Sequence, residues 1–164
     1  MEYYTFYPSP RGQLLITAQD DFITGIWYHD AHPIPARATP SDTLPVFRQV
    51  QMWLDAYFAG NSCKIHHLPL KPKGTPFQML VWKLLLDIPW GETVTYGSLA
   101  NQAAELLGRE KMSAQAIGQA VGKNPISIVI PCHRCMGAGN TLTGYAGGLE
   151  RKRFLLDLEQ IQYK

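Results

Sequence analysis

The residues best suited to chemistry lie together at positions 127–134, where a cysteine and a histidine directly follow an apolar run and a proline. The apolar run predicts a short buried strand. Pro131 has no N–H to donate and would end that strand, so Cys132 should lie where a pocket can begin. Imidazole or cationic neighbours lower the pKa of a thiol, which makes Cys132 a candidate nucleophile. The alternative is a small buried hydrophobic residue, the usual environment of a free cysteine.

A thiolate nucleophile needs a base, and the base needs a group that orients it. His133 is next to Cys132, but adjacent residues on a turn need not touch, so a water could connect them. The last predicted helix runs from residue 149 to about residue 162, and within it Glu159 shares the core-facing side with Leu155 and Leu156. A buried carboxylate needs a partner, and His133 is the candidate.

Two other kinds of site would use the same cysteine. Residues 132–135 form a Cys-x-x-Cys motif, which is typical of redox pairs, but glycines follow it here instead of the usual helix. Cys63 and His66, taken with this second pair, have the spacing of zinc ligands. The two halves of that zinc site lie far apart in the sequence, so we favour the nucleophile.

Composition indicates a globular protein of one or two domains. The chain has 164 residues, of which 46% are hydrophobic, enough to bury a core. It has neither an apolar run of about 20 residues nor a signal-like N-terminus, so we expect no membrane contact. Three cysteines argue against a disulfide framework and favour a reducing cytoplasm.

Charge is spread unevenly over a net value of +2. Residues 1–67 carry four Lys or Arg against six Asp or Glu, a net −2, and residues 68–164 carry eleven against seven, a net +4. A basic C-terminal half fits contact with a polyanion.

The N-terminal half is predicted to be a small α/β domain. Residues 4–7, 13–18 and 22–28 are rich in strand formers and separated by turn residues, the pattern of an antiparallel meander. The proline-containing segment 29–44 predicts a loop, and residues 45–58 have apolar side chains at helical spacing. No catalytic motif is evident here, and we place the domain boundary between residues 67 and 68.

The C-terminal half is predicted to be mostly helical. Thr75 is a good N-cap, Pro76 fits the first helical position and Gln78 completes a capping box, so a helix should begin here. Two helices follow in tandem at about residues 96–107 and 113–121, a variant of the helix-turn-helix with a long connection. The second has small side chains that would allow close approach to a narrow surface, although ordinary helix packing also explains them.

A series of short motifs then runs through the C-terminal half in order. They are Gly-Thr-Pro-Phe-Gln at 74–78, Val-Trp at 81–82, Ile-Pro at 88–89, Thr-Tyr-Gly-Ser-Leu-Ala at 95–100, Asn-Pro-Ile at 124–126, Pro-Cys-His-Arg at 131–134 and Gly-Tyr-Ala-Gly-Gly at 144–148. With these motifs the chain resembles the O6-alkylguanine-DNA alkyltransferases (methylated-DNA–protein-cysteine methyltransferases) of the bacterial type. The resemblance is detailed over residues 74–160. It implies an RNase H-like N-terminal domain, residues 1–67, and a C-terminal DNA-binding and alkyl-acceptor domain, residues 68–164.

The resemblance also implies an activity, direct reversal of alkylation damage. Cys132 would take the alkyl group from O6 of guanine, or from O4 of thymine, once per molecule and without a cofactor. His133 would act through water as its base, oriented by Glu159, and Asn124 would brace the active-site loop. Tyr96 would help rotate the nucleotide out of the stack, which hides O6, and donate a proton toward guanine N3. In related alkyltransferase-like proteins tryptophan replaces the cysteine, so Cys132 indicates a transferase rather than a non-catalytic damage sensor, the competing class.

Further contacts follow from the same resemblance. The partner would be double-stranded DNA with alkylated bases, bound through its minor groove by a monomer without a metal site. The residues implied to contact DNA are Thr95, Tyr96, Gly97, Gln115, Ala116 and Ala138. Those implied to line the substrate pocket are Val121, Cys135, Tyr145 and Ala146.

The sequence departs from the family pattern in three places. Gln115 stands where the family has an intercalating arginine, so we expect weaker DNA binding and a shallower salt dependence, by about one phosphate-equivalent contact at most. The segment joining the tandem helices is longer than usual, and Arg109 or Lys111 within it could supply a substitute cation. Cys135 stands where a valine is usual.

Overall fold

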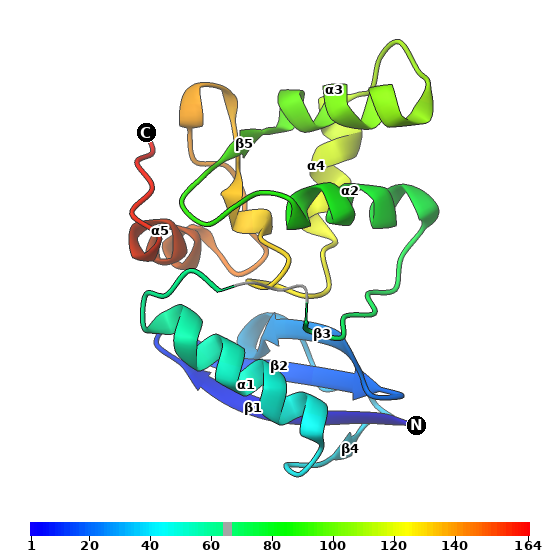
Figure 1. Ribbon diagram of the computed structural model, residues 1–164, viewed down its shortest axis with the longest axis vertical. Helices are drawn as coiled ribbons and strands as arrows, with labels where there is room; N and C mark the ends of the chain where they lie inside the picture. The colour runs from blue at the N-terminus through cyan, green and yellow to red at the C-terminus, as the bar shows by residue number, and fades with distance from the viewer. Residues whose placement is uncertain (64–66) are drawn as a thin grey trace. The chain divides into compact units, whose positions relative to one another are not determined.

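The computed structural model describes residues 1–63 and 67–164 and divides into two compact units (Figure 1). The N-terminal unit comprises Met1–Lys73 together with Pro125–Ser127, and the C-terminal unit comprises Gly74–Asn124 and Ile128–Lys164. The boundary between residues 67 and 68 stays a prediction. His66, part of the alternative zinc site, falls outside the described residues. No helix in the described ranges is long and apolar enough to cross a membrane.

The N-terminal unit is a sheet with one helix packed on it (Figure 1). Its strands are β1 (Glu2–Ser9), β2 (Gly12–Gln19), β3 (Phe22–Tyr28) and β4 (Thr39–Pro40), in the order β3-β2-β1-β4. The helix α1 (Pro45–Phe58) buries Val46, Phe47, Val50, Trp53, Leu54 and Tyr57. The predicted meander and helix are confirmed.

The segment between β3 and α1 was predicted to be a loop, and that prediction is wrong at two places. His29–Ala31 forms a 3-10 turn, η1, and β4 pairs in parallel with β1. The partners in this pairing are Tyr3 with Thr39 and Tyr4 with Pro40. A proline is tolerated in a short edge strand, where its missing N–H leaves no interior ladder bond unmade. The local composition therefore gave no sign of β4, because this short strand forms only through its pairing with β1.

The C-terminal unit carries the remaining elements. They are α2 (Pro76–Leu86), β5 (Val94–Thr95), α3 (Tyr96–Leu107), α4 (Ala114–Gly122), η2 (Cys132–Arg134), β6 (Cys135–Met136), η3 (Ala138–Asn140) and α5 (Leu149–Leu158). Helix α2 contacts α3, α4 and η2 and is central to this unit. β5 and β6 form a two-stranded parallel sheet, which brings the start of α3 beside the segment that follows η2.

The helix boundaries in this unit follow local capping rules. At α2, Thr75 and Gln78 make both arms of the predicted capping box. Thr95 caps α3 by accepting the Ser98 N–H, and Gly108, with φ of 66°, ends that helix in the left-handed region that glycine tolerates. The prediction of two tandem helices is thus confirmed.

Residues 127–130, predicted to be a buried strand, are instead a buried turn. Ile128 has φ of 73°, which no strand residue adopts. Pro131 has φ of −81° and ψ of 63°, and the Cys132 N–H donates to the Ile130 carbonyl at 2.7 Å, the geometry of an inverse γ-turn. The apolar run correctly predicts burial, but a buried turn and a buried strand have the same composition.

Helix α5 ends at Leu158, one turn earlier than predicted, because a Schellman motif closes it. Gln160 takes the left-handed conformation at φ of 60°, and the Ile161 N–H donates to the Leu156 carbonyl at 2.9 Å. Ile161 and Leu156 also belong to one buried cluster. This ending places Glu159 at the helix cap with its side chain buried, as predicted from its position on the core-facing side with Leu155 and Leu156.

Candidate active site

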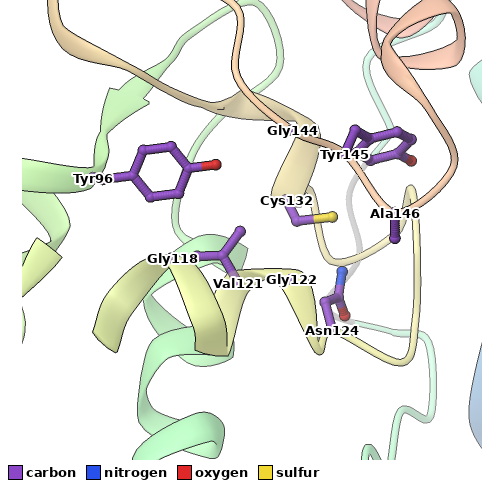
Figure 2. Close-up of a pocket in the computed structure, with 9 residues that line it drawn as sticks. All are labelled: Tyr96, Gly118, Val121, Gly122, Asn124, Cys132, Gly144, Tyr145 and Ala146. Carbon is purple, nitrogen blue, oxygen red and sulfur yellow. The ribbon is translucent and has the colours of Figure 1, made fainter. Parts of the chain in front are cut away.

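The C-terminal unit contains a cavity of about 400 Å³, within the range of small-molecule sites (Figure 2). Its floor and walls come from the start of α3, from α4 and the segment after it, from η2 and from the loop before α5. The lining residues are Tyr96, Gly118, Val121, Gly122, Asn124, Cys132, Gly144, Tyr145 and Ala146. The predicted pocket residues Val121, Tyr145 and Ala146 thus meet the predicted nucleophile around one space.

Cys132 lies at the start of η2, directly after the turn at Pro131, and its sulfur points into the cavity (Figure 2). The side chain is only 7% exposed. Burial raises the pKa of this thiol, while a hydrogen bond from Asn124 and the positive charge of Lys152 act in the opposite direction. Since the net shift is upward, the thiol is protonated at rest and needs a base to become a nucleophile.

The predicted base and its orienting group are in direct contact. His133 Nε2 and Glu159 Oε2 lie 2.6 Å apart, and both side chains are fully buried. Arg134 Nε donates to the other carboxylate oxygen at 2.7 Å, and the Gly91 N–H donates to the same oxygen at 3.2 Å. Burial alone would raise the pKa of Glu159, but the hydrogen bonds and charges of His133 and Arg134 lower it to about 2. Glu159 is therefore ionised at neutral pH.

This arrangement determines which nitrogen of His133 can act as a base. Burial lowers the pKa of His133, with the nearby cations acting in the same direction and Glu159 acting against them, so the ring is neutral at pH 7. An ionised carboxylate can only accept hydrogen bonds, so Nε2 carries the proton that Glu159 receives. The lone pair is then on Nδ1, the atom that can accept a proton.

Asn124 is the buried residue that holds the active-site turn in shape. It lies two residues after the end of α4, and its Nδ2 donates to the Ile130 carbonyl at 2.9 Å. Its side chain also forms a hydrogen bond with Cys132 that favours the thiolate. Asn124 thus acts on both the backbone of the turn and the charge of the nucleophile.

Tyr96, the first residue of α3, faces the cavity from the side opposite Tyr145 (Figure 2). Its hydroxyl accepts a hydrogen bond from Thr143 at 3.1 Å, and burial raises its pKa. Its ring lies against Gly118 of α4, where an added Cβ would come within 3.8 Å. That distance is ordinary van der Waals contact, so the phenol packs against this turn of α4 and an alanine would also fit there.

Lys152 is a functional candidate that sequence reasoning missed. It is completely buried, and its Nζ donates to the Cys135 carbonyl at 2.8 Å. Burial lowers its pKa, while the thiols of Cys135 and Cys132 act in the opposite direction. The signal was available, because Lys152 shares the inward face of α5 with Leu155, Leu156 and Glu159.

The remaining predicted pocket residue, Cys135, is completely buried and is not among those that line the cavity. Burial raises the pKa of its thiol to about 12. Cys63, Cys132 and Cys135 are all free thiols. A cysteine that stays protonated is a poor partner for thiol–disulfide exchange, which counts against the redox-pair alternative.

Comparison with known proteins identifies the family. Residues 76–161 match the family model of the DNA-binding domain of 6-O-methylguanine DNA methyltransferase, and residues 2–72 match that of its ribonuclease-like domain. The chain belongs to the 6-O-methylguanine DNA methyltransferase family. The resemblance stated from the sequence motifs and the predicted two-part α/β fold are thereby confirmed.

Relatives of known name cover nearly the whole chain. The methylated-DNA–protein-cysteine methyltransferase of Haemophilus influenzae is 47% identical over 98% of this chain and 88% of its own length. The constitutive enzyme of that name from Bacillus subtilis is 39% identical over 100% of this chain and 99% of its own length. A crystal structure of Mycobacterium tuberculosis O6-methylguanine methyltransferase superimposes with a TM-score of 0.85, at 41% identity over 98% of this chain and 93% of that one. The M. tuberculosis OGT has also been solved in complex with DNA, and that chain gives a TM-score of 0.85 at 39% identity, over 96% of this chain and 92% of that one.

The residues that the methyltransferase resemblance assigns to DNA contact lie mostly on the surface. Gly97, Gln115 and Ala138 are exposed, and Thr95 and Ala116 are half-buried. Thr95 also has a structural task as the cap of α3. On α4 the buried residues are Ile117, Ala120 and Val121, so packing accounts for only part of its small side chains. Their DNA-binding roles stay predictions.

Proposed function

We propose that this chain repairs DNA by moving the alkyl group of O6-alkylguanine, or of O4-alkylthymine, to the sulfur of Cys132. The observation that carries the proposal is the Cys132 thiol at the wall of a cavity, followed directly by a neutral histidine whose Nε2–H is held by an ionised glutamate. Membership of the methyltransferase family supports the same reaction.

The geometry supports the following sequence of steps. The Cys132 thiol loses its proton to Nδ1 of His133 through a water, and Glu159 stabilises the imidazolium that forms. The thiolate attacks the alkyl carbon, so an S–C bond forms as the C–O6 bond breaks. The electron pair of the broken bond stays on the guanine, which takes a proton at N3 from the Tyr96 hydroxyl. The Tyr96 phenolate then regains a proton from water and the His133 imidazolium releases one to water, so the proton lost by the thiol balances the one gained by the base. The thioether remains on Cys132, so each molecule reacts once.

We further propose that the partner is double-stranded DNA containing alkylated bases, approached by a monomer through the minor groove. The outward face of α4 supports this geometry, because Gln115, Ala116, Gly118 and Gly122 give it an exposed or half-exposed surface with little bulk. A helix with such a face can lie close to the narrow minor groove, which is about 6 Å wide. The damaged nucleotide must then rotate out of the stack to enter the cavity beside α4.

The decisive experiment is the intact mass of the protein after incubation with a duplex oligonucleotide that carries one O6-methylguanine. The expected result is a gain of one methylene unit, which is absent with unmodified DNA and absent for Cys132→Ser. Tight binding to the lesion without any gain would identify a non-catalytic damage sensor. If the reduced protein neither binds the lesion nor gains mass, the proposal is contradicted altogether.

A further inference from the structure

Three polar side chains form a continuous chain behind the cavity. Nζ of the buried Lys152 donates to Thr143 Oγ1 at 3.4 Å, and Thr143 Oγ1 donates to the Tyr96 hydroxyl oxygen at 3.1 Å. Lys152 also donates to the Cys135 carbonyl at 2.8 Å, which fixes the position of its ammonium group. The chain therefore joins a buried positive charge on α5 to the phenol that faces the cavity from α3.

The direction of the hydrogen bonds along this chain is determined by the lysine. An ammonium group has three donors and no acceptor, so Thr143 must accept at its end of the Lys152 bond. A hydroxyl has one proton, and Thr143 donates that proton to Tyr96. Because the Tyr96 oxygen accepts from Thr143, its own proton points elsewhere.

Two acceptors can receive the Tyr96 proton. One is the Cys135 sulfur, which forms a hydrogen bond with this hydroxyl. The other is a group bound in the cavity that Tyr96 lines. Thiol sulfur is a weak acceptor, so a heteroaromatic nitrogen in the cavity competes well for the proton.

We infer that Thr143 is a positioning residue that links Lys152 to Tyr96 and so keeps the Tyr96 O–H available to donate to a ring nitrogen of the flipped base. This inference rests on the alkyl transfer proposed above. Without the Thr143 hydroxyl, the Tyr96 oxygen no longer accepts a hydrogen bond from residue 143. The Tyr96 proton is then free to point toward residue 143 instead of toward the base in the cavity. A charge-assisted chain of hydrogen bonds also polarises its members cooperatively, which strengthens the phenol as a donor.

The test compares two substitutions at Thr143 in single-turnover alkyl transfer from an O6-methylguanine duplex, with protein in excess and lesion binding measured separately. Thr143→Val keeps the shape and the methyl group that lies beside Gly137 but removes the hydroxyl. It should slow transfer about tenfold, the factor expected for one hydrogen bond, while lesion binding changes little. Thr143→Ser restores the hydroxyl and should recover most of the lost rate. Thr141→Val serves as the control, because it removes an exposed hydroxyl that donates to the Ala138 carbonyl at 3.1 Å and not to Tyr96.

A double-mutant cycle separates a role through Tyr96 from a general structural role. In a Tyr96→Phe background the end of the chain is missing, so Thr143→Val should produce no further slowing. The inference is overturned by a Thr143→Val rate equal to wild type, by equal slowing in Thr143→Ser or Thr141→Val, or by full slowing in the Tyr96→Phe background. Failure of the proposed function looks different, because wild-type protein itself would then gain no methyl group.

Discussion

The carboxylate of Glu159 and the imidazole of His133 share a hydrogen bond of 2.6 Å, and solvent reaches neither side chain. Glu159 is the cap residue of α5, whereas His133 lies in the short η2 turn that begins with Cys132, the proposed nucleophile. The bond therefore joins the C-terminal helix to the active-site turn. Arg134 holds the second oxygen of the same carboxylate, so its orientation is set from two directions.

Stability should fall as the pH is lowered from about 4.5 to about 2. The pKa of Glu159 is about 2 in the folded chain against an ordinary value of 4.5. A lowered folded-state pKa means that the contribution of Glu159 is fully present above the unfolded value and is lost as the pH falls through the folded value. The shift corresponds to about 3 kcal/mol at most. Urea denaturation at a series of pH values measures it.

The control for this titration is Glu159→Gln, compared with Glu105→Gln at an exposed position of α3. Glu159→Gln should be destabilised at neutral pH, by about 3 kcal/mol, because a buried Arg134 loses its anion. Its stability should also change less between pH 4.5 and 2 than that of wild type. Parallel curves for wild type and Glu159→Gln would show that Glu159 is not the group responsible.

Replacing Lys152 with methionine should make Cys132 less reactive. The buried ammonium lowers the pKa of the Cys132 thiol, so its loss raises that pKa and reduces the thiolate fraction at neutral pH. We expect alkyl transfer to slow by roughly tenfold to hundredfold. The pH dependence of iodoacetamide modification, located at Cys132 by mass spectrometry, should move upward. The exposed Lys83→Met on α2 is the matched control, and an unchanged pH profile in Lys152→Met would contradict the electrostatic role.

Asn124→Ala should destabilise the fold and slow transfer together. It leaves the buried Ile130 carbonyl without the 2.9 Å hydrogen bond from Asn124, at a cost of about 1–3 kcal/mol. It also removes a group that favours the Cys132 thiolate. Denaturant unfolding and single-turnover kinetics measure the two effects, with Asn101→Ala on the exposed side of α3 as the control. A full rate with lowered stability would limit Asn124 to bracing the turn.

Local rules were enough to predict the helices of the C-terminal unit. The capping box of Thr75 and Gln78 and the left-handed Gly108 act within a few residues, so the sequence shows them directly. The pairing of Glu159 with His133 followed from helix periodicity and the cost of burying a carboxylate. These predictions needed no knowledge of tertiary structure beyond which face turns inward.

Tertiary contacts decided the features that sequence reasoning did not find. Residues 127–130 are apolar in either a strand or a buried turn, and the positive φ of Ile128 has no local signature. Lys152 was overlooked because lysine is rarely buried, although its spacing from Glu159 placed it inward. Its partners, the Cys135 carbonyl and Thr143, belong to segments whose proximity to α5 could not be predicted from the sequence.

Gln115→Arg should strengthen binding to duplex DNA. Gln115 is exposed in the first turn of α4, beside the small residues of its outward face, so an added cation there would be free to meet a phosphate or fill the vacated stack. Each phosphate neutralised steepens the dependence of log K on log salt by about 0.9, so the slope should become more negative by about one. Affinity measured at several salt concentrations checks this change.

Gln119→Arg is the matched control for this prediction, because it adds the same charge one turn later on α4 at another exposed position. If Gln115 marks the position of the intercalating residue, Gln115→Arg should also speed alkyl transfer at saturating DNA, since it fills the space left by the flipped base. Gln119→Arg should change only the salt-dependent affinity. If the two variants have equal effects on affinity and on rate, Gln115 is only one exposed site among others. If Gln115→Arg changes neither affinity nor rate, Gln115 is not a DNA-contacting residue.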